Sequence, residues 1–225
     1  MKKTKYIFLG VTFFISFACA LYVTMLVFPI ASFSKSKTER SVLAKVQDGD
    51  IIFQTSESSQ CEAVRIATGS KFSHCGLILN VNDKWFVFEA VQPVKLTPLE
   101  QWIVHGKEGK YVVKRLKNAT AVLNPATLEK MKTYGNQFAG KQYDAYFEWT
   151  DNRIYCSELV WKIYKNGAGI ELSKLQHLKD FNLADERVKK VLKERYGNDI
   201  PLDEEVVSPS NLADSKLLTT IIDTY

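Results

Sequence analysis

Cysteine is scarce in this sequence, with four residues among 225, namely Cys19, Cys61, Cys75 and Cys156. Their spacing contains no pair of the C-x2-C kind, which argues against a structural zinc site. Cys19 lies in an apolar run, and the other three are an odd number, which points to at least one free thiol. A framework of several disulfides is therefore not expected, although a single Cys61–Cys75 bridge stays open.

An excess of one charge is also lacking over most of the chain. The formal net charge is +5, but residues 1–40 hold six lysines and arginines against one glutamate. The remaining residues carry 24 basic and 24 acidic side chains. Such a balance lacks the basic stripe of a nucleic-acid-binding domain, so no nucleic acid partner is expected. Internal repeats and low-complexity tracts, the marks of solenoids and disordered tails, are absent as well.

Long apolar runs are confined to the N-terminus, where residues 6–30 follow Lys2, Lys3 and Lys5. A helix needs about 20 apolar residues to cross a bilayer, and this run is long enough. The sequence therefore predicts an uncleaved transmembrane anchor. Because the lysines closest to the run precede it, we expect the domain on the extracytoplasmic face.

Two other interpretations of the N-terminal segment stay open. The tripeptide Ala18-Cys19-Ala20 has the small-x-small form of a signal-peptidase site, and Cys19 also allows a lipid anchor. The predicted organisation is an anchor or signal segment over residues 1–33, a linker over 34–45 and a catalytic domain over 46–225.

The domain begins with strand patterns and continues with helix patterns, which is typical of an α+β fold. Ser59 and Glu62 have capping-box spacing, and Asn124 precedes Pro125 at a second helix start. Asp151 or Asn152 is expected to cap the helix that carries Cys156. The predicted strands cover residues 51–53, 73–79, 85–90 and 111–116, and the predicted helices end at residues 68, 140, 167, 196 and 213.

A hairpin turn centred between Asn82 and Asp83 would pair residues whose numbers sum to 165. Since side chains alternate along a strand, His74 and Glu89 then share one face and lie diagonally across the pair. A carboxylate in that position would fix the imidazole tautomer and support its cationic form. A register slip of one residue would break this contact. Cys75 falls on the opposite face, where it is expected only to pack.

Cys156 falls in the first turn of its predicted helix. The unpaired N–H groups and the helix dipole there stabilise a thiolate, and the same N–H groups can bind a tetrahedral oxyanion. A thiolate, a base and an oxyanion site are the parts of a cysteine acyl-transfer enzyme. Spacing alone leaves a plainer alternative open, in which Cys156 and His74 are core residues and Glu89 is a surface carboxylate.

Six motifs, taken together and in this order, resemble the YiiX/YebB-like family, a group of permuted papain-like cysteine amidases related to the NlpC-type peptidases. The resemblance covers about residues 46–218. It implies a circularly permuted papain-like (NlpC-type) α+β core, in which an antiparallel β-sheet or barrel packs against helices. The motifs are DGDIIF (48–53), KFSHCGLIL (71–79), FEA (88–90), KQYDAYFEW (141–149), YCSELVWKIY (155–164) and VVSPSNLADS (206–215).

The resemblance also implies roles for single residues. Cys156 matches the nucleophile, His74 the general base and Glu89 the residue that orients the base. Tyr143 matches a pocket or oxyanion-side position, and a structural role beside Asp144 is an equal alternative. No metal and no cofactor are implied.

The expected function is hydrolysis of amide bonds through an acyl-enzyme, in peptidoglycan stem peptides or related cell-envelope peptides. The expected partners are thus a cell-wall peptide or acyl substrate, and the membrane through the N-terminal helix. One alternative is a lipid-directed acyltransferase or lipase of the lecithin:retinol acyltransferase-like type. The other is an envelope binding module with a degenerate site.

Overall fold

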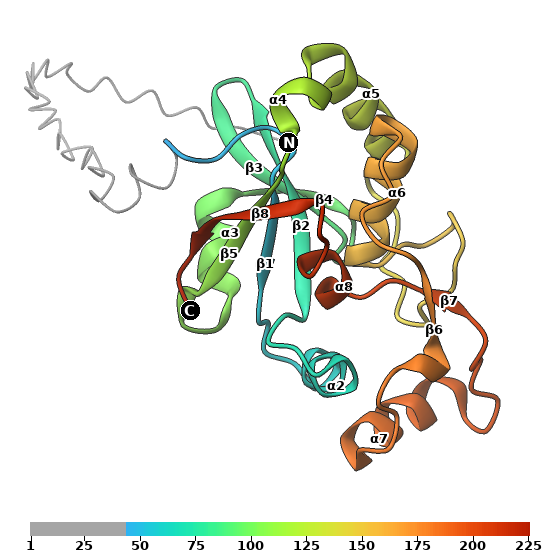
Figure 1. Ribbon diagram of the computed structural model, residues 1–225. Coiled ribbons are helices and arrows are strands. Elements are labelled where there is room, and N and C mark those ends of the chain that lie inside the picture. The colour runs from blue at the N-terminus through green and yellow to red at the C-terminus, as the bar shows by residue number, and fades with distance from the viewer. Residues whose placement is uncertain (1–43) are drawn as a thin grey trace, which may run out of the picture. The chain divides into compact units, whose positions relative to one another are not determined.

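The computed structural model describes residues 44–225, and its central feature is a six-stranded antiparallel sheet (Figure 1). The strands lie in the order β4-β3-β2-β1-β5-β8. Helices cover the sheet, so the expected α+β class is confirmed for these residues. The strands are β1 (Ile51–Gln54), β2 (His74–Val81), β3 (Lys84–Glu89), β4 (Lys95–Pro98), β5 (Tyr111–Leu116) and β8 (Leu218–Asp223).

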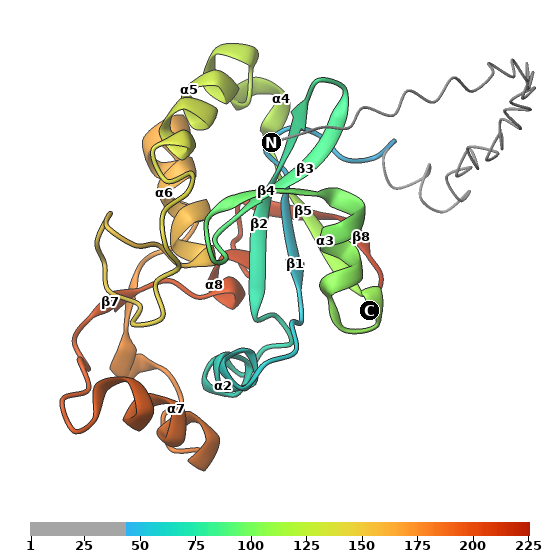
Figure 2. The same ribbon diagram turned by 180° about the vertical axis from the view of Figure 1, so that it is seen from behind.

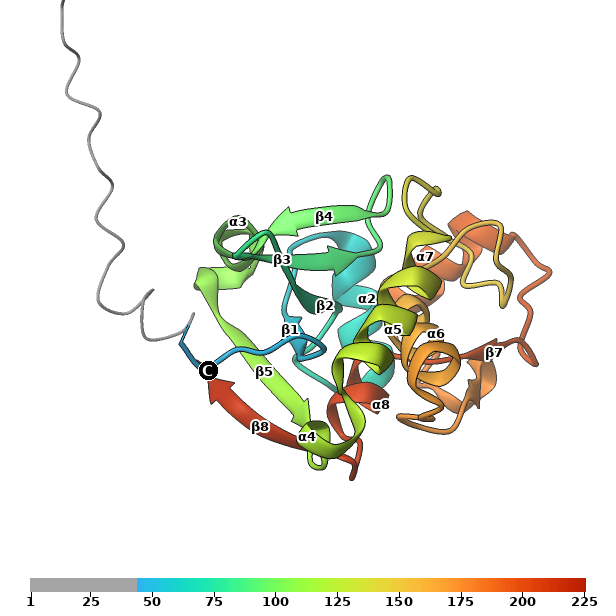
Figure 3. The same cartoon turned by 90° about the horizontal axis from the view of Figure 1, so that it is seen from above.

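The sheet is strongly curved, with β4 and β8 at its two edges (Figure 3). Along one face, α5 (Pro125–Asn136) and α6 (Cys156–Ala168) pack side by side, and α6 contacts β2 directly. The other face holds a second buried cluster, in which Ile52, Ile78 and Val87 pack with Trp102 of α3 (Leu99–His105). Both faces of the central strands are therefore buried.

The β2–β3 hairpin has the expected register. Leu77 pairs with Phe88 and Asn80 with Trp85, so the residue numbers of each pair sum to 165. Asn82 and Asp83 have φ of 50° and 59°, as a two-residue type I′ turn requires. The turn thus places β2 and β3 in the one register in which His74 and Glu89 share a face.

Several predicted helix boundaries are corrected by the structure. The side chain of Ser58, not that of Ser59, caps α2 (Ser59–Thr68) by accepting from the Cys61 N–H at 3.1 Å. Asp185 caps α7 (Glu186–Tyr196) by accepting from the Arg187 N–H, and the helix ends at residue 196 as predicted. The Asn124 cap is confirmed, since its side chain accepts from Thr127 N–H.

The helix that carries Cys156 departs from expectation at both ends. Its N-cap is Tyr155 and not Asp151 or Asn152, and the Glu158 carboxylate accepts the Tyr155 N–H at 3.3 Å. Local capping rules favoured the aspartate and asparagine, but the acceptor comes from inside the helix. Gly167 lies within α6, which ends at Ala168 and is capped by Gly169.

A smaller group of elements lies at the end of the sheet where β1 ends and β2 begins (Figure 2). Here α2 packs against α7, and Ala63, Leu178, Val188 and Leu192 form a separate buried cluster. The remaining elements are α4 (Ala119–Val122), α8 (Pro209–Ala213), the two-stranded sheet of β6 (Gln176–His177) and β7 (Glu205–Val206), and the 3-10 turns η1 (Lys107–Gly109) and η2 (Leu178–Asp180).

The expected anchor over residues 1–33 and the linker as far as residue 43 lie outside the described residues, and these remain predictions. Within residues 44–225, no helix combines the length and the apolar character needed to cross a bilayer.

Gly167 sets the distance between α5 and α6. A Cβ atom at this position would lie 2.6 Å from Met131 Cα and 2.9 Å from Met131 N, both of them backbone atoms. We expect Gly167→Ala to lower the free energy of unfolding by about 1–3 kcal/mol, because overpacking outweighs the gain in helix propensity. Urea denaturation measures the change. The exposed neighbour Asn166, changed to Ala, is the control and should differ from the unaltered chain by less than about 0.5 kcal/mol. Equal stability of the two variants would contradict the close helix packing.

Candidate active site

Cys156 is the first residue of α6, and its side chain is buried. Two contacts fix this helix start to the segment before α8. The hydroxyl of Tyr155 accepts the Val207 N–H at 3.1 Å, and the Ser157 hydroxyl donates to the Val207 carbonyl at 2.8 Å. The thiol is therefore held where the free N–H groups of the first helical turn converge.

His74 and Glu89 meet across the hairpin, as the register predicted. The imidazole Nε2 lies 2.6 Å from a Glu89 carboxylate oxygen, and both side chains are buried. Gly76 leaves room for this contact, since a Cβ there would lie 2.4 Å from Val87 and 3.3 Å from the Glu89 Cβ. With Nε2 engaged by Glu89, the other ring nitrogen remains for Cys156.

Two residues that the sequence analysis did not single out hold the carboxylate of Glu89. The Thr97 hydroxyl, on β4, donates to one oxygen at 2.5 Å, and the Trp102 indole N–H, on α3, donates to the other at 2.8 Å. The Trp102 ring also stacks on the His74 imidazole, with centroids 5.8 Å apart and planes 26° apart. Glu89 and His74 are thus fixed from three elements.

The contacts set the protonation states of this pair. Burial raises the pKa of Glu89, but the hydrogen bonds from His74, Thr97 and Trp102 outweigh burial and lower it below its ordinary value. Burial lowers the pKa of His74, but hydrogen bonds and charges from Cys156 and Glu89 raise it to about 10. At neutral pH the site therefore contains a carboxylate and an imidazolium.

The Cys156 thiol is the third member of this chain of charges. Its pKa is lowered well below the ordinary value, most of all by a hydrogen bond from the Cys75 thiol. Burial acts in the opposite direction, while the His74 imidazole and the Cys75 backbone N–H lower the pKa further. The contacts therefore favour the thiolate of Cys156 beside the His74 imidazolium, which is the reactive form of a cysteine nucleophile.

The role expected for Cys75 was incomplete. Its side chain does lie on the face opposite Glu89 and is fully buried, but this face is the one that α6 covers. Burial and then the adjacent Cys156 thiolate raise the pKa of the Cys75 thiol, so that it stays protonated and can donate. Cys61, Cys75 and Cys156 are all free thiols, so the Cys61–Cys75 bridge left open above does not form.

Tyr143 lines the same pocket as Cys156, and its hydroxyl accepts a hydrogen bond from Gln60 of α2 at 2.9 Å. Burial and then the negative charge of Cys156 raise the pKa of this phenol. The neighbouring Asp144 faces away from this chemistry, since its carboxylate accepts the N–H groups of Tyr146 and Glu148 in its own loop. Tyr143 therefore lies where a substrate at Cys156 would contact it.

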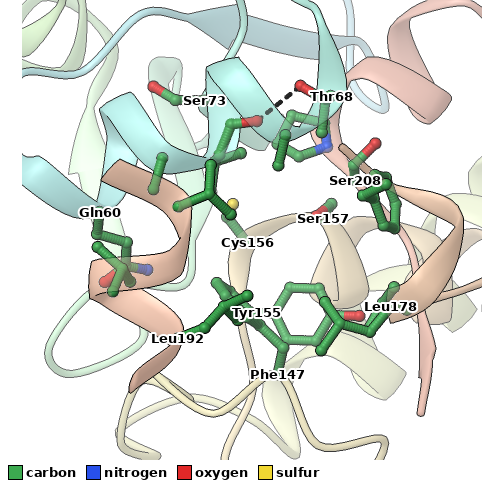
Figure 4. Close-up of a pocket in the computed structure, with 18 of the residues that line it drawn as sticks. Gln60, Thr68, Ser73, Phe147, Tyr155, Cys156, Ser157, Leu178, Leu192 and Ser208 are labelled. Carbon is green, nitrogen blue, oxygen red and sulfur yellow. Dashed lines mark hydrogen bonds between the residues drawn. The ribbon is translucent and has the colours of Figure 1, made fainter. Parts of the chain in front are cut away.

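A pocket that is partly open to solvent lies beside Cys156 (Figure 4). Hydrocarbon side chains form most of its wall, and few polar groups interrupt them. The apolar lining residues come mainly from α2, α7 and the two segments near residues 178–183 and 206–209. They are Ala63, Val64, Ala67, Leu178, Phe181, Leu183, Val188, Val191, Leu192, Val206, Val207 and Pro209.

This chain resembles a solved structure over most of its length. It is the crystal structure described as metalloprotein yiiX from Escherichia coli O157:H7, with a TM-score of 0.77, 48% identity, and coverage of 80% of this chain and 99% of that chain. In residues 44–225 of the present chain, no group of three or more His, Cys, Asp or Glu side chains is arranged to hold a metal ion. The Glu89 carboxylate is already engaged by His74, Thr97 and Trp102.

The sequence comparisons agree with the likeness in structure. The protein YiiX of Escherichia coli strain K12 is 49% identical over 175 residues, which cover 78% of this chain and 85% of YiiX. The profile described as "Permuted papain-like amidase enzyme, YaeF/YiiX, C92 family" matches residues 45–222. The suspected resemblance is thereby confirmed, and the chain belongs to the YaeF/YiiX family of permuted papain-like amidases.

Proposed function

We propose that this chain cuts an amide bond through an acyl-enzyme, with Cys156 as nucleophile, His74 as acid and base, and Glu89 as the residue that orients His74. The observation that carries the proposal is the buried series of thiolate, imidazolium and carboxylate. A degenerate binding module would have no need for a thiol held ionised beside an imidazolium at a helix start.

The chemistry follows from the proton on His74. The Cys156 thiolate attacks the carbonyl carbon, and the N–H groups at the start of α6 stabilise the negative charge that develops on the oxygen. The imidazolium protonates the leaving nitrogen, the amine departs, and a thioester remains on Cys156. His74, now neutral, takes a proton from water. The resulting hydroxide attacks the thioester and releases the carboxylic acid.

The wall of the pocket favours an apolar acyl group. Peptidoglycan stem peptides, the substrate expected first from the sequence, carry carboxylates and amides that need polar partners when they are desolvated. The pocket beside Cys156 offers mainly hydrocarbon, to which an alkyl chain gains about 25 cal/mol per Å² of surface that it buries. This observation favours the lipid-directed alternative, and the stem peptide remains a prediction from the resemblance.

Replacement of the nucleophile tests the proposal directly. We expect Cys156→Ala to lower kcat/KM by at least about 10⁴-fold on a medium-chain N-acyl anilide, because no other cysteine of residues 44–225 lines the pocket. The unaltered chain, quenched with acid during turnover, should gain the mass of the acyl group on the peptide that contains Cys156. Cys61→Ala, which removes a free thiol that does not line the pocket, is the control and should keep full activity. Activity that survives in Cys156→Ala would contradict this mechanism.

A stem peptide assayed in parallel with the anilide distinguishes the two substrate classes. Cleavage of the stem peptide alone would identify a peptide as the substrate.

The pH profile depends on the charge of Glu89. Activity requires the Cys156 thiolate together with the His74 imidazolium, so kcat/KM should stay level above the lowered thiol pKa and fall as His74 loses its proton near pH 10. Glu89→Gln removes the negative charge that holds the proton on His74. We therefore expect the alkaline limb of kcat/KM to move to lower pH, as steady-state kinetics from pH 5 to 11 would measure. An unchanged alkaline limb would show that Glu89 does not hold the His74 proton.

Cys75 provides a test of the environment of the thiolate. Cys75→Ala removes the thiol donor to Cys156 while the backbone N–H remains, so the pKa of Cys156 should rise. The rate of alkylation by iodoacetamide against pH reports this pKa when it is measured in a Cys61→Ala background. The Cys61→Ala chain with Cys75 intact is the reference. Identical profiles for the two chains would mean that Cys75 does not act on the nucleophile.

A further inference from the structure

Arg195 is the one lysine or arginine among the residues that line the pocket in the described part of the chain. It lies in the last turn of α7 and is partly buried. Its guanidinium carbon lies 5.2 Å from the centroid of the Phe147 ring, which also lines the pocket. A cation is thus held over an aromatic face at the wall of an otherwise apolar pocket.

Two other cations of α7 have acidic partners, whereas Arg195 has none among residues 44–225. Arg187, on the same helix, pairs with Asp185 and Glu62 at 3.0 and 2.9 Å, and Lys189 pairs with Glu186 at 2.8 Å. The guanidinium of Arg195 forms no ion pair and no hydrogen bond with any residue of the range 44–225. A partly desolvated guanidinium without a carboxylate is costly unless a ligand supplies the anion.

Tyr143 connects Arg195 to the chemistry. Burial raises the pKa of its phenol most, the negative charge of Cys156 raises it further, and the positive charge of Arg195 lowers it. All three residues line one pocket, together with Gln60, which donates to the Tyr143 hydroxyl. A single small molecule in the pocket can therefore contact Arg195 and place a carbonyl at Cys156.

We propose that Arg195 binds an anionic group, a carboxylate or a phosphate, on a substrate whose alkyl part fills the apolar pocket. The substrate class is then an anionic amphiphile with an acyl amide. The identity of the bond that is cut rests on the proposed function, whereas the binding of the anion does not. The planar guanidinium presents paired N–H donors that match two oxygens of either anion. Phe147 packs against the guanidinium through its ring face.

Binding without turnover tests the site independently of catalysis. Decanoate, decyl phosphate and 1-decanol share one alkyl chain and differ in the head group. Calorimetric titration of each into the full chain carrying Cys156→Ala measures affinity where no bond can be cut. We expect the chain to bind both anions more tightly than 1-decanol, and the tighter of the two identifies carboxylate or phosphate as the preferred group.

The variant Arg195→Met, made in the Cys156→Ala chain, should weaken binding of the preferred anion by about 10- to 100-fold, the usual worth of hydrogen bonds to a charged group. Its affinity for 1-decanol should stay the same. Arg195→Lys keeps the charge but not the paired donors, so its affinity for the anion should lie between those two chains. Lys193→Met removes an exposed cation from the same helical turn and is the matched control, with no change expected.

Three results would overturn the proposal. Equal weakening of the anion and of 1-decanol in Arg195→Met would mean that the variant disturbs the pocket and that Arg195 recognises no anion. Retention of anion binding in that variant would place the anion elsewhere. Failure of all three compounds to bind the Cys156→Ala chain would remove the amphiphile site itself, while the acyl-enzyme measurement on the unaltered chain would still decide the proposed hydrolysis separately.

Discussion

The 2.6 Å contact between His74 and Glu89 is the interaction on which the rest of the site depends. It exists because the two-residue turn at Asn82 and Asp83 fixes the register of β2 and β3. A slip of one residue would move the carboxylate to the face that α6 covers and leave the imidazole among apolar side chains. Gly76 serves the same contact, since any side chain there would collide with Val87. The register of the hairpin therefore decides whether His74 and Glu89 can meet.

Alternating charge makes this buried arrangement tolerable. A carboxylate taken out of water is costly, and the donors on Thr97, Trp102 and His74 offset that cost. The carboxylate then holds a proton on the imidazole, and the imidazolium in turn holds the Cys156 thiolate beside the positive end of α6. Cys75 completes the series as a neutral donor, because a second negative charge beside the first would be repelled. Each charge in the series is stabilised by the one before it.

The sequence carried the parts of the site that local rules determine, namely the turn, the alternation of β2 and β3, and the thiol at a helix start. It did not reveal Thr97 or Trp102, since β4 is four residues long and ends in a proline, too short for an alternating pattern. It also missed the partnership of Cys75 with Cys156, because β2 is buried on both faces from His74 to Leu79 and no pattern tells which face receives α6. Cys156 lies near the end of β2, where its thiol interacts with His74 on one face of the strand and with Cys75 on the other. Only the tertiary arrangement shows this.

Chemistry and substrate choice lie on different elements of this fold. The reacting groups come from β2, β3 and the start of α6, which belong to the sheet and the helices packed on it. Much of the pocket wall comes from α2 and α7, whose own buried cluster is separate from the core beneath Cys156. Because the two clusters are separate, side chains of α2 and α7 can change without moving the His74–Glu89 contact. The composition of the pocket wall therefore reports on the substrate, while the charges around Cys156 report only on the kind of bond that is cut.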